Sequence, residues 1–322
     1  MNRIFYESNS NINIESVTEP VEHGEGPFWD AEKKVLYFVD LLKGGINKYD
    51  PNTGDLQRLD LDGPVTLIVP AKGETEQFVI GHGRDIVALK WNGTSDKPSS
   101  LSVLASVDKN KPENRFNDGK ADAKGRLWAG TMGPEKPELL YNEGSLFSFE
   151  WTNNFSPVNH LSPVSISNGL AWNENNDKMY YIDSPTRKIN VFDFNLSEGS
   201  ISNQTDLFSL DSNNLPGVPD GMTIDDKGNL WVALYNGSSV INIDTNTGRL
   251  INKIKLPVTF PTSCVFGGDD FQDLYVTTSR KDLTEKEVSQ EPLAGSLLRI
   301  TGLEVRGQGT FNKFAMRKVV HH

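Results

Sequence analysis

Residues 114–132 read NRFNDGKADAKGRLWAGTM, and their plan is repeated in outline through most of the chain. An acidic or amide residue stands before a glycine, a short strand follows, a glycine turn reverses the chain, and a second strand begins. Such short runs, separated by Asn-Gly, Lys-Gly and Asp-Gly pairs, are typical of an all-β protein. The polar residue and glycine that open this segment have three counterparts elsewhere. They are Glu25-Gly26, Asn168-Gly169 and Asp220-Gly221.

A two-strand unit of this kind occurs six times along the chain. The units span residues 34–50, 77–90, 126–149, 178–193, 229–244 and 273–300. An apolar strand start precedes each unit, and most units are followed by a fourth, weaker strand such as residues 56–61 or 250–256. A repeat of roughly 40–50 residues with four strands is the signature of a β-propeller blade. We therefore predict an all-β fold, a six-bladed β-propeller with four-stranded antiparallel blades around a central channel.

The six repeats fill the available length, so we expect a single propeller domain over residues 1–322. A (β/α)8 barrel, the competing architecture, needs eight amphipathic helices, and the chain shows no long stretch of 3.6-residue periodicity. Residues 283–293 predict one short helix, inserted into the last repeat. Because an open ring of blades is unstable at its seam, we expect residues 12–17 to complete the last blade beside residues 311–314. Residues 315–322 are expected to form a tail.

The composition excludes several kinds of protein. The formal net charge is −11, and an acidic surface repels phosphate backbones, which argues against a nucleic-acid partner. Cys264 is the only cysteine, so neither an internal disulfide nor a thiolate metal cluster can form. The N-terminus has no apolar signal segment, and no run of about 18 apolar residues occurs. We expect a cytoplasmic monomer that acts on a small molecule and binds neither nucleic acid nor membrane.

The four polar residues that precede glycine predict a shared site. In a propeller the innermost strands line the channel, so residues at the starts of these strands face one another across one mouth. Here that place is held by Glu25, Asp118 with Asn117 beside it, Asn168 and Asp220. Carboxylates brought together repel one another unless a positive charge lies among them. All the donors are oxygens, which favours one hard divalent cation: Ca²⁺ first, with Mg²⁺ or Mn²⁺ as alternatives. Zn²⁺, a borderline ion, is a further alternative.

An ordinary turn is the competing interpretation of each pair, because Asp, Asn and Gly all favour turns. We assign the polar residues that follow a few positions later to turns. These are Asp30, Asp122, Asn173 and Asp225. The four starts are different, because they recur at the spacing of the repeat. The second and sixth repeats carry no carboxylate at this place, so the predicted site is lopsided.

Six short motifs span nearly the whole chain. They are GEGPFW (24–29), NRFNDGK (114–120), WAGTM (128–132), SNGLAW (167–172), YYID (180–183) and PDGMTID (219–225). Together, and in this order, they resemble the senescence marker protein/regucalcin/gluconolactonase family. Three further segments are most similar to its insect branch, which includes the firefly luciferin-regenerating enzyme. They are PGVPD (216–220), NLWVA (229–233) and VFGG (265–268).

The resemblance implies a six-bladed propeller with one divalent metal in its channel. By motif, the metal ligands would be Glu25, Asn168 and Asp220. Asn117 would lie near the metal and contact the substrate, and Arg115 would bind substrate hydroxyl or carboxylate groups. A third substrate-binding residue is implied at Glu135, which matches a substrate-contacting Glu of the sugar-lactonase members.

The activity implied is metal-dependent lactone hydrolysis. The metal would polarise the lactone carbonyl while a water attacks it, with Asp220 as the candidate general base and a metal-bound hydroxide as the alternative. Three other functions stay open: hydrolysis of a nitrile-like luciferin precursor or an organophosphate, a calcium-binding regulatory role without catalysis, and a propeller scaffold for protein partners. The loops at residues 134–143 and 280–292 would decide the substrate.

Overall fold

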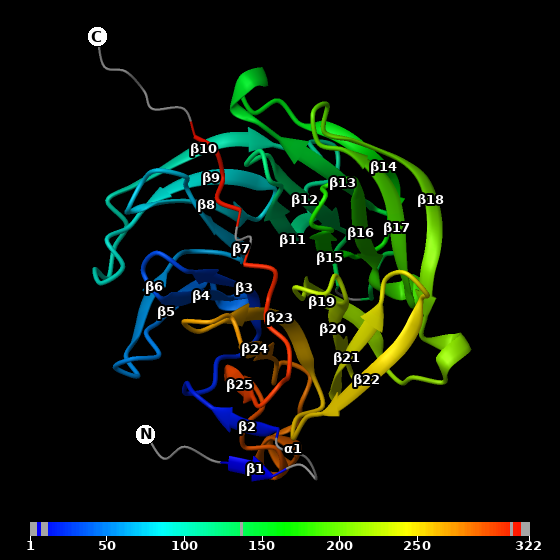
Figure 1. Ribbon diagram of the computed structural model, residues 1–322. Helices are drawn as coiled ribbons and strands as arrows, with labels where there is room; N and C mark the ends of the chain where they lie inside the picture. The colour runs from blue at the N-terminus through cyan, green and yellow to red at the C-terminus, as the bar shows by residue number, and fades with distance from the viewer. Residues whose placement is uncertain (1–4, 8–11, 136–137, 310–311, 317–322) are drawn as a thin grey trace.

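The computed structural model describes residues 5–7, 12–135, 138–309 and 312–316, which form six antiparallel sheets arranged as a ring (Figure 1). Five of these sheets have four strands, and the sixth has five strands in the order β1-β2-β25-β24-β23. Each sheet is one blade. The predicted six-bladed β-propeller with four-stranded antiparallel blades is therefore confirmed.

The blades follow one another along the chain. Blade 1 contains β3 (Gly24–Asp30), β4 (Val35–Asp40), β5 (Gly45–Tyr49) and β6 (Leu56–Asp60). Blade 2 contains β7 (Val65–Pro70), β8 (Gln77–His82), β9 (Asp85–Lys90) and β10 (Ser100–Ser106). Blade 3 contains β11 (Arg115–Ala121), β12 (Leu127–Met132), β13 (Gly144–Phe149) and β14 (Val158–Val164). Blade 4 contains β15 (Ser167–Trp172), β16 (Lys178–Asp183), β17 (Lys188–Asn195) and β18 (Ser200–Ser209).

The last two blades complete the ring. Blade 5 contains β19 (Val218–Ile224), β20 (Leu230–Tyr235), β21 (Ser239–Asp244) and β22 (Arg249–Lys255). Blade 6 contains β23 (Pro261–Gly267), β24 (Asp273–Thr278), β25 (Leu298–Thr301), β2 (Asn13–Ser16) and β1 (Phe5–Glu7). The short helices are η1 (Leu41–Lys43), η2 (Trp151–Asn153), η3 (Ser184–Thr186), η4 (Asp211–Asn213) and α1 (Glu285–Gln290). No helix in the described residues is both long and apolar enough to cross a membrane.

The first strand of each blade lines the channel. Each of these strands contacts the first strands of the blades on both sides. Near the start of each one, a register shift interrupts its pairing with the second strand. Such β-bulges bend a strand and change the direction in which its side chains point. Because the shift falls at the same place in every blade, the six bulges encircle one mouth of the channel.

The N-terminal strand closes the ring in blade 6. Strand β2 pairs antiparallel with β25 over its whole length, and Ile14 is fully buried against Leu298 and Ile300. The prediction that residues 311–314 lie beside this strand was wrong. Residue 311 lies outside the described residues, and Phe314 forms its β-bridge with Ala71 in blade 2. Strand β2 therefore extends the sheet at the free edge of β25. The short helix predicted in the last repeat is confirmed as α1, between β24 and β25.

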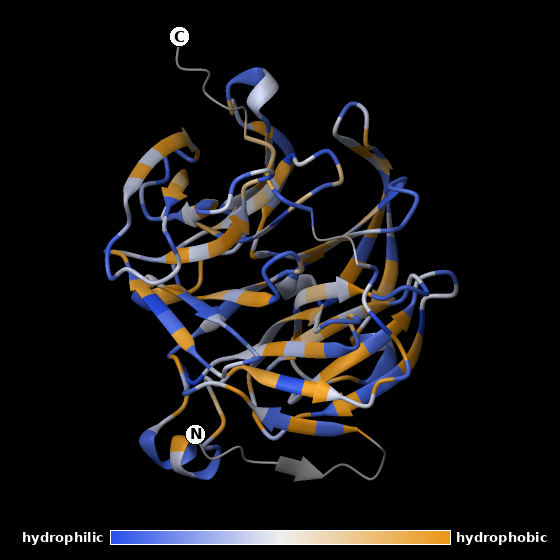
Figure 2. Ribbon diagram, turned by 60° about the vertical axis from the view of Figure 1, so that its left-hand side comes forward, coloured by the Kyte–Doolittle hydropathy of each residue, from blue (hydrophilic) through white to orange (hydrophobic). Residues whose placement is uncertain are grey.

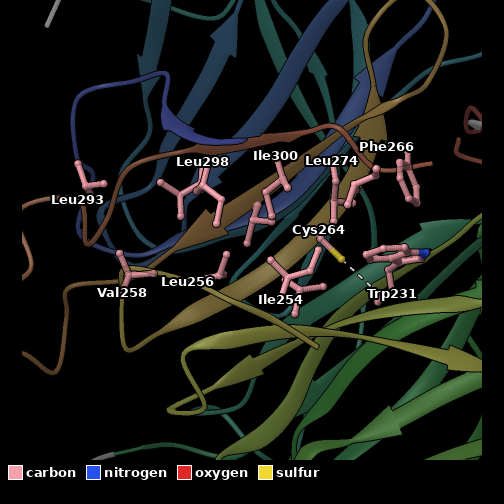
Figure 3. Close-up of a cluster of buried hydrophobic side chains, with 14 of the residues drawn as sticks. Trp231, Ile254, Leu256, Val258, Cys264, Phe266, Leu274, Leu293, Leu298 and Ile300 are labelled. Carbon is pink, nitrogen blue, oxygen red and sulfur yellow. Dashed lines mark hydrogen bonds between the residues drawn. The ribbon is translucent and has the colours of Figure 1, made fainter. Parts of the chain in front are cut away.

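The core lies between neighbouring blades. Apolar residues recur along the strands (Figure 2), and each cluster of buried apolar side chains joins strands of two neighbouring blades. Between blades 5 and 6, Trp231 and Ile254 pack against Cys264, whose Sγ donates a hydrogen bond to the Trp231 carbonyl oxygen at 3.2 Å (Figure 3). The only cysteine is therefore a buried packing residue.

Aspartates at the ends of the first strands organise turns. Asp122 Oδ2 accepts a hydrogen bond from Trp128 Nε1 at 3.1 Å, and Asp225 Oδ2 accepts one from Trp231 Nε1 at 2.9 Å. Both carboxylates also accept backbone N–H groups of their own turns. Asp30 does the same in blade 1. The assignment of these residues to turns is confirmed.

The segment that follows β25 crosses the mouth of the channel opposite the bulges, seen as the red trace in Figure 1. Its backbone bonds to three blades in turn. Arg306 O accepts from Asp226 N at 2.8 Å, Phe314 N donates to Pro70 O at 2.9 Å, and Ala315 N donates to Gly125 O at 2.9 Å. This segment therefore connects blades 5, 2 and 3 at the end of the channel away from the bulges.

Candidate metal and substrate site

Four of the six bulges carry the residues that the sequence singled out. Each lies at or near the register shift of its first strand. They are Glu25 in β3, Asn117 and Asp118 in β11, Asn168 in β15 and Asp220 in β19. All five side chains are buried, although the strands begin one to three residues earlier than the sequence suggested. The bulge, rather than the strand terminus, turns these residues toward the mouth.

Glycine follows these residues because adjacent first strands approach each other closely. A Cβ atom at Gly169 would lie 2.7 Å from the carbonyl oxygen of Asp220, and one at Gly221 would lie 1.9 Å from Ser263 Oγ. Neither distance is compatible with a side chain. The glycines thus let blades 4, 5 and 6 bring their bulges together.

Several buried oxygens at the mouth lack a hydrogen-bond partner among the described residues. Asn168 donates Nδ2 to Ser184 Oγ at 3.0 Å, which leaves its Oδ1 without a donor. Asp220 Oδ1 and Asp118 Oδ2 are also buried and have no hydrogen-bond donor among the described residues. Buried polar atoms are normally paired, so the unpaired oxygens of Asn168 and Asp220 can accept a ligand, whereas Asp118 has the positive charge of Lys120 on its own strand.

The raised pKa values of the acids at this mouth also favour a positive charge among them. Burial raises the pKa of Glu25 to about 8, and the charge of Asp118 adds to this shift. Burial also raises the pKa of Asp220 well above its ordinary value, with further contributions from Glu25 and Asp118. The three carboxylates are therefore close enough to repel one another in the ionised state. A cation among them would reverse these shifts.

The donor set fits a hard cation. Two carboxylates and one amide oxygen, from Glu25, Asp220 and Asn168, are the oxygen ligands that Ca²⁺ accepts, and they leave further positions for water or substrate. Within the described residues, no group of three or more His, Cys, Asp or Glu side chains is arranged to hold a metal ion. The predicted triad contains only two acids, so it differs from an all-acid or histidine-rich centre.

The substrate residues predicted from the sequence form a connected cluster at the rim. Arg115 Nη1 donates to Asn117 Oδ1 at 2.7 Å, and Arg115 Nη2 donates to Glu135 Oε1 at 2.8 Å. Asn117 in turn donates Nδ2 to the carbonyl oxygen of Ser167 in blade 4, at 2.9 Å. The structure thus brings Arg115, Asn117 and Glu135 together, next to the acids at the bulges.

Sequence reasoning missed one member of this cluster. Lys281 Nζ donates to Glu135 Oε2 at 2.8 Å. Burial by itself would raise the pKa of Glu135, but Arg115 and Lys281 together lower it to about 2. Lys281 lies in the loop that we expected to govern substrate choice. Nothing in its local sequence indicates that it reaches blade 3.

His23 also borders this cluster. Its Nδ1 lies 2.7 Å from Ser279 Oγ, and its ring meets that of Tyr235 edge-on at 6.4 Å between centroids. Burial, with help from Lys281 and Arg115, lowers the pKa of His23 to about 3. A neutral imidazole therefore forms part of the wall and adds no charge to it.

A separate cavity of about 110 Å³ occupies the channel beyond the bulges. Its wall includes Asp118 and Lys120 and extends to Gln308 and Asn312 in the crossing segment. Glu25, Asn168 and Asp220 are absent from its lining. The cavity therefore belongs to the far half of the channel, and the candidate site lies at the mouth.

Sequence comparison identifies relatives over most of the chain. The family described as "SMP-30/Gluconolactonase/LRE-like region" matches residues 23–280. Regucalcin from Xenopus laevis is 40% identical over 301 residues, covering 92% of this chain and 97% of that protein. Regucalcin from Homo sapiens is 39% identical over 305 residues, with the same coverage of both chains.

Solved structures of similar shape agree with this result. A luciferin-regenerating enzyme is 37% identical, with a TM-score of 0.88 over 94% of this chain and 99% of that chain. A calcium-binding regucalcin from Agrobacterium tumefaciens is 22% identical, with a TM-score of 0.83 over 94% of this chain and 97% of that one. The second likeness supports the fold alone.

Proposed function

Because the chain belongs to the SMP-30/gluconolactonase/LRE-like family, we propose that it is a hydrolase that opens lactones with the help of one divalent cation. The observation that carries the proposal is the pair of unpaired, buried oxygens on Asn168 and Asp220, at one mouth of the channel. Buried polar atoms are normally hydrogen-bonded, so these two oxygens support a bound ligand at the mouth.

In this proposal Glu25, Asn168 and Asp220 hold the cation. Ca²⁺ is favoured because all three supply oxygen, with Mg²⁺, Mn²⁺ and Zn²⁺ as alternatives. When bound, such an ion withdraws electrons from a lactone carbonyl and stabilises the negative charge that develops on its oxygen. Asp118 does not join the triad, because Lys120 on the same strand supplies its counter-charge.

The protein residues position the reactants. Arg115, Asn117 and Glu135 hold the hydroxyl groups of the lactone at the rim. Asp220 accepts a proton from the attacking water, whose oxygen bonds to the carbonyl carbon. The ring C–O bond then breaks, and the leaving oxygen takes up a proton, which yields the open hydroxy acid. A water-derived proton and hydroxyl are thus added across one ester bond.

Two substitutions test this proposal. Asp220→Ala and Glu25→Gln should each lower the enzyme-catalysed rate of D-glucono-1,5-lactone opening by roughly 10²–10³-fold with Ca²⁺ or Mn²⁺ present. Asp206→Asn, an exposed acid on β18, is the control and should retain activity. Rates are measured above spontaneous hydrolysis. Full activity of both site variants would refute the mechanism.

A calcium-binding regulatory role without turnover is the second candidate. The relatives at 39–40% identity are regucalcins, and a more distant one is described as calcium-binding. In that case the wild-type protein would bind Ca²⁺ but hydrolyse no lactone. A luciferin-regenerating type of activity, suggested by the relative at 37% identity, would appear as turnover of its substrate in place of lactones. A single domain, a monomeric state and a cytoplasmic location stay predictions.

A further inference from the structure

The rim of the candidate site contains an ion-pair chain that crosses the mouth. Glu135 follows β12 in blade 3, whereas Lys281 follows β24 in blade 6. In a ring of six blades these two stand opposite each other. Glu135 Oε2 nevertheless lies 2.8 Å from Lys281 Nζ, while its Oε1 lies 2.8 Å from Arg115 Nη2. One carboxylate therefore serves two cations above the mouth of the channel.

The backbone of Lys281 is held firmly in this place. Its N–H donates to Ser279 Oγ at 3.2 Å, the preceding Arg280 N–H donates to Glu22 O at 2.9 Å, and Leu283 N–H closes the turn on Arg280 O at 3.0 Å. The loop is thus anchored to the segment that leads into β3. Lys281 is presented to the rim by a defined turn.

The ammonium group of Lys281 has unused hydrogen-bonding capacity. A lysine carries three N–H donors, and among the described residues Glu135 supplies the acceptor found for Lys281. The side chain is 20% exposed, and that of Glu135 is 30% exposed, so a ligand can reach both from solvent. Arg115 is more enclosed, at 12%, and already contacts Asn117 and Glu135. Of the two cations, Lys281 is therefore the more exposed and makes fewer hydrogen bonds.

The ion pairs at the rim contain more cations than carboxylates. With a divalent cation on the triad, the charges of Glu25 and Asp220 are neutralised. Two cations, Arg115 and Lys281, then share the single carboxylate of Glu135. Asp282 follows Lys281, but it is exposed and its Oδ2 accepts from the neutral hydroxyl of Tyr235 at 2.6 Å. An anion from the ligand would give each rim cation its own carboxylate.

We propose that the substrate is a lactone that bears a carboxylate, which binds Lys281 while Glu135 remains on Arg115. This inference rests on the proposed lactonase function and specifies its substrate class. Lys281 would be the residue that distinguishes acidic from neutral lactones. A charge-assisted hydrogen bond of this kind changes affinity by about tenfold or more.

Two lactones with the same ring test this proposal. D-glucaro-1,4-lactone ends in a carboxylate where D-glucono-1,4-lactone ends in a CH₂OH group. The wild-type protein should show kcat/KM at least about tenfold higher for the acidic lactone. Lys281→Gln should bring the ratio close to one. Lys286→Gln, in α1 of the same insert, should leave the ratio as in the wild type.

A binding measurement separates this inference from the proposed function. Calorimetry on the metal-free protein compares D-gluconate with D-sorbitol, two polyols that differ by one carboxylate. The wild type should prefer gluconate by about tenfold, and Lys281→Gln should lose the preference. If this holds but neither lactone is opened, the lactonase function fails and the anion site stands. The anion site is refuted if the wild type and Lys281→Gln show the same ratio of kcat/KM for the acidic and neutral lactones. It is also refuted if gluconate binds the wild type no better than sorbitol.

Discussion

His160 shows how one side chain couples the stability of the fold to pH. Its ring stacks on Trp128 at 4.2 Å between centroids, and its Nε2 lies 2.8 Å from Ser148 Oγ. Burial, with help from the charge of Arg126, lowers the pKa of His160 from 6.5 to about 4. The folded protein therefore prefers the neutral imidazole over a range in which the unfolded chain is already protonated.

This preference makes a prediction at the level of one residue. As pH falls from 7.5 to 4.5, the unfolded chain takes up a proton first, so His160 should lower the free energy of unfolding by about 1–2 kcal/mol, allowing for partial exposure. Above pH 6.5 this loss is absent. His160→Gln should remove that part of the pH dependence. Urea unfolding of both proteins at several pH values measures it, and parallel curves would contradict it.

The site residues were predictable from the sequence to different degrees. Glu25, Asp118, Asn168 and Asp220 could be placed at one mouth because each precedes a glycine at the same place in a repeat. The choice of Glu25, Asn168 and Asp220 as metal ligands came from the resemblance to the family. Lys281 could not be found in this way. It reaches the rim through a turn after β24 and meets Glu135 from the opposite blade, a contact that no repeat pattern encodes.

At the scale of the element, the β-bulge near the start of each first strand could not be predicted from the sequence. Alternation predicts strands, but a one-residue register shift leaves no hydrophobic pattern of its own. Between Ser167 and Leu170, for example, the shift places Asn168 and Gly169 outside regular pairing. The sequence predicted that residues 12–17 complete the last blade. Their partner β25 was not predicted, because residues 298–301 and residues 311–314 are both apolar enough to pair with them.

The close approach at Gly169 gives a prediction for this element. A Cβ there would meet the backbone of Asp220 and Met222 within 3 Å, so Gly169→Ala should push blade 5 away from blade 4. We expect a loss of about 1–3 kcal/mol of stability and a weaker affinity for Ca²⁺. Gly54→Ala is the control. Its added Cβ meets nothing within 4 Å, so Ca²⁺ affinity should not change. Equal Ca²⁺ affinity in both variants, measured by calorimetry, would contradict the prediction.

At the scale of the whole molecule, the segment after β25 holds blades together at the mouth away from the site. Phe314 is fully buried there, with its ring 5.7 Å from that of Phe155. Its backbone bonds to Pro70 and Lys72 of blade 2. The chain therefore closes twice, through β2 in blade 6 and through this segment across the channel.

Truncation of that side chain should destabilise the whole propeller. Phe314→Ala removes a buried aromatic ring and should lower the free energy of unfolding by about 3–5 kcal/mol. Leu101→Ala, at an exposed position of β10, should cost less than about 1 kcal/mol. Urea unfolding followed by tryptophan fluorescence compares the two. A similar small loss in both variants would mean that the segment does not secure the ring.

The central claim is that Glu25, Asn168 and Asp220 hold one divalent cation at the mouth of the channel. Calorimetric titration of Ca²⁺ into chelator-treated protein tests it most directly. The wild type should bind one ion per chain, Asp220→Asn should weaken binding by at least about tenfold, and Asp206→Asn should bind as the wild type does. No binding to the wild type, or equal binding to Asp220→Asn, would contradict the claim.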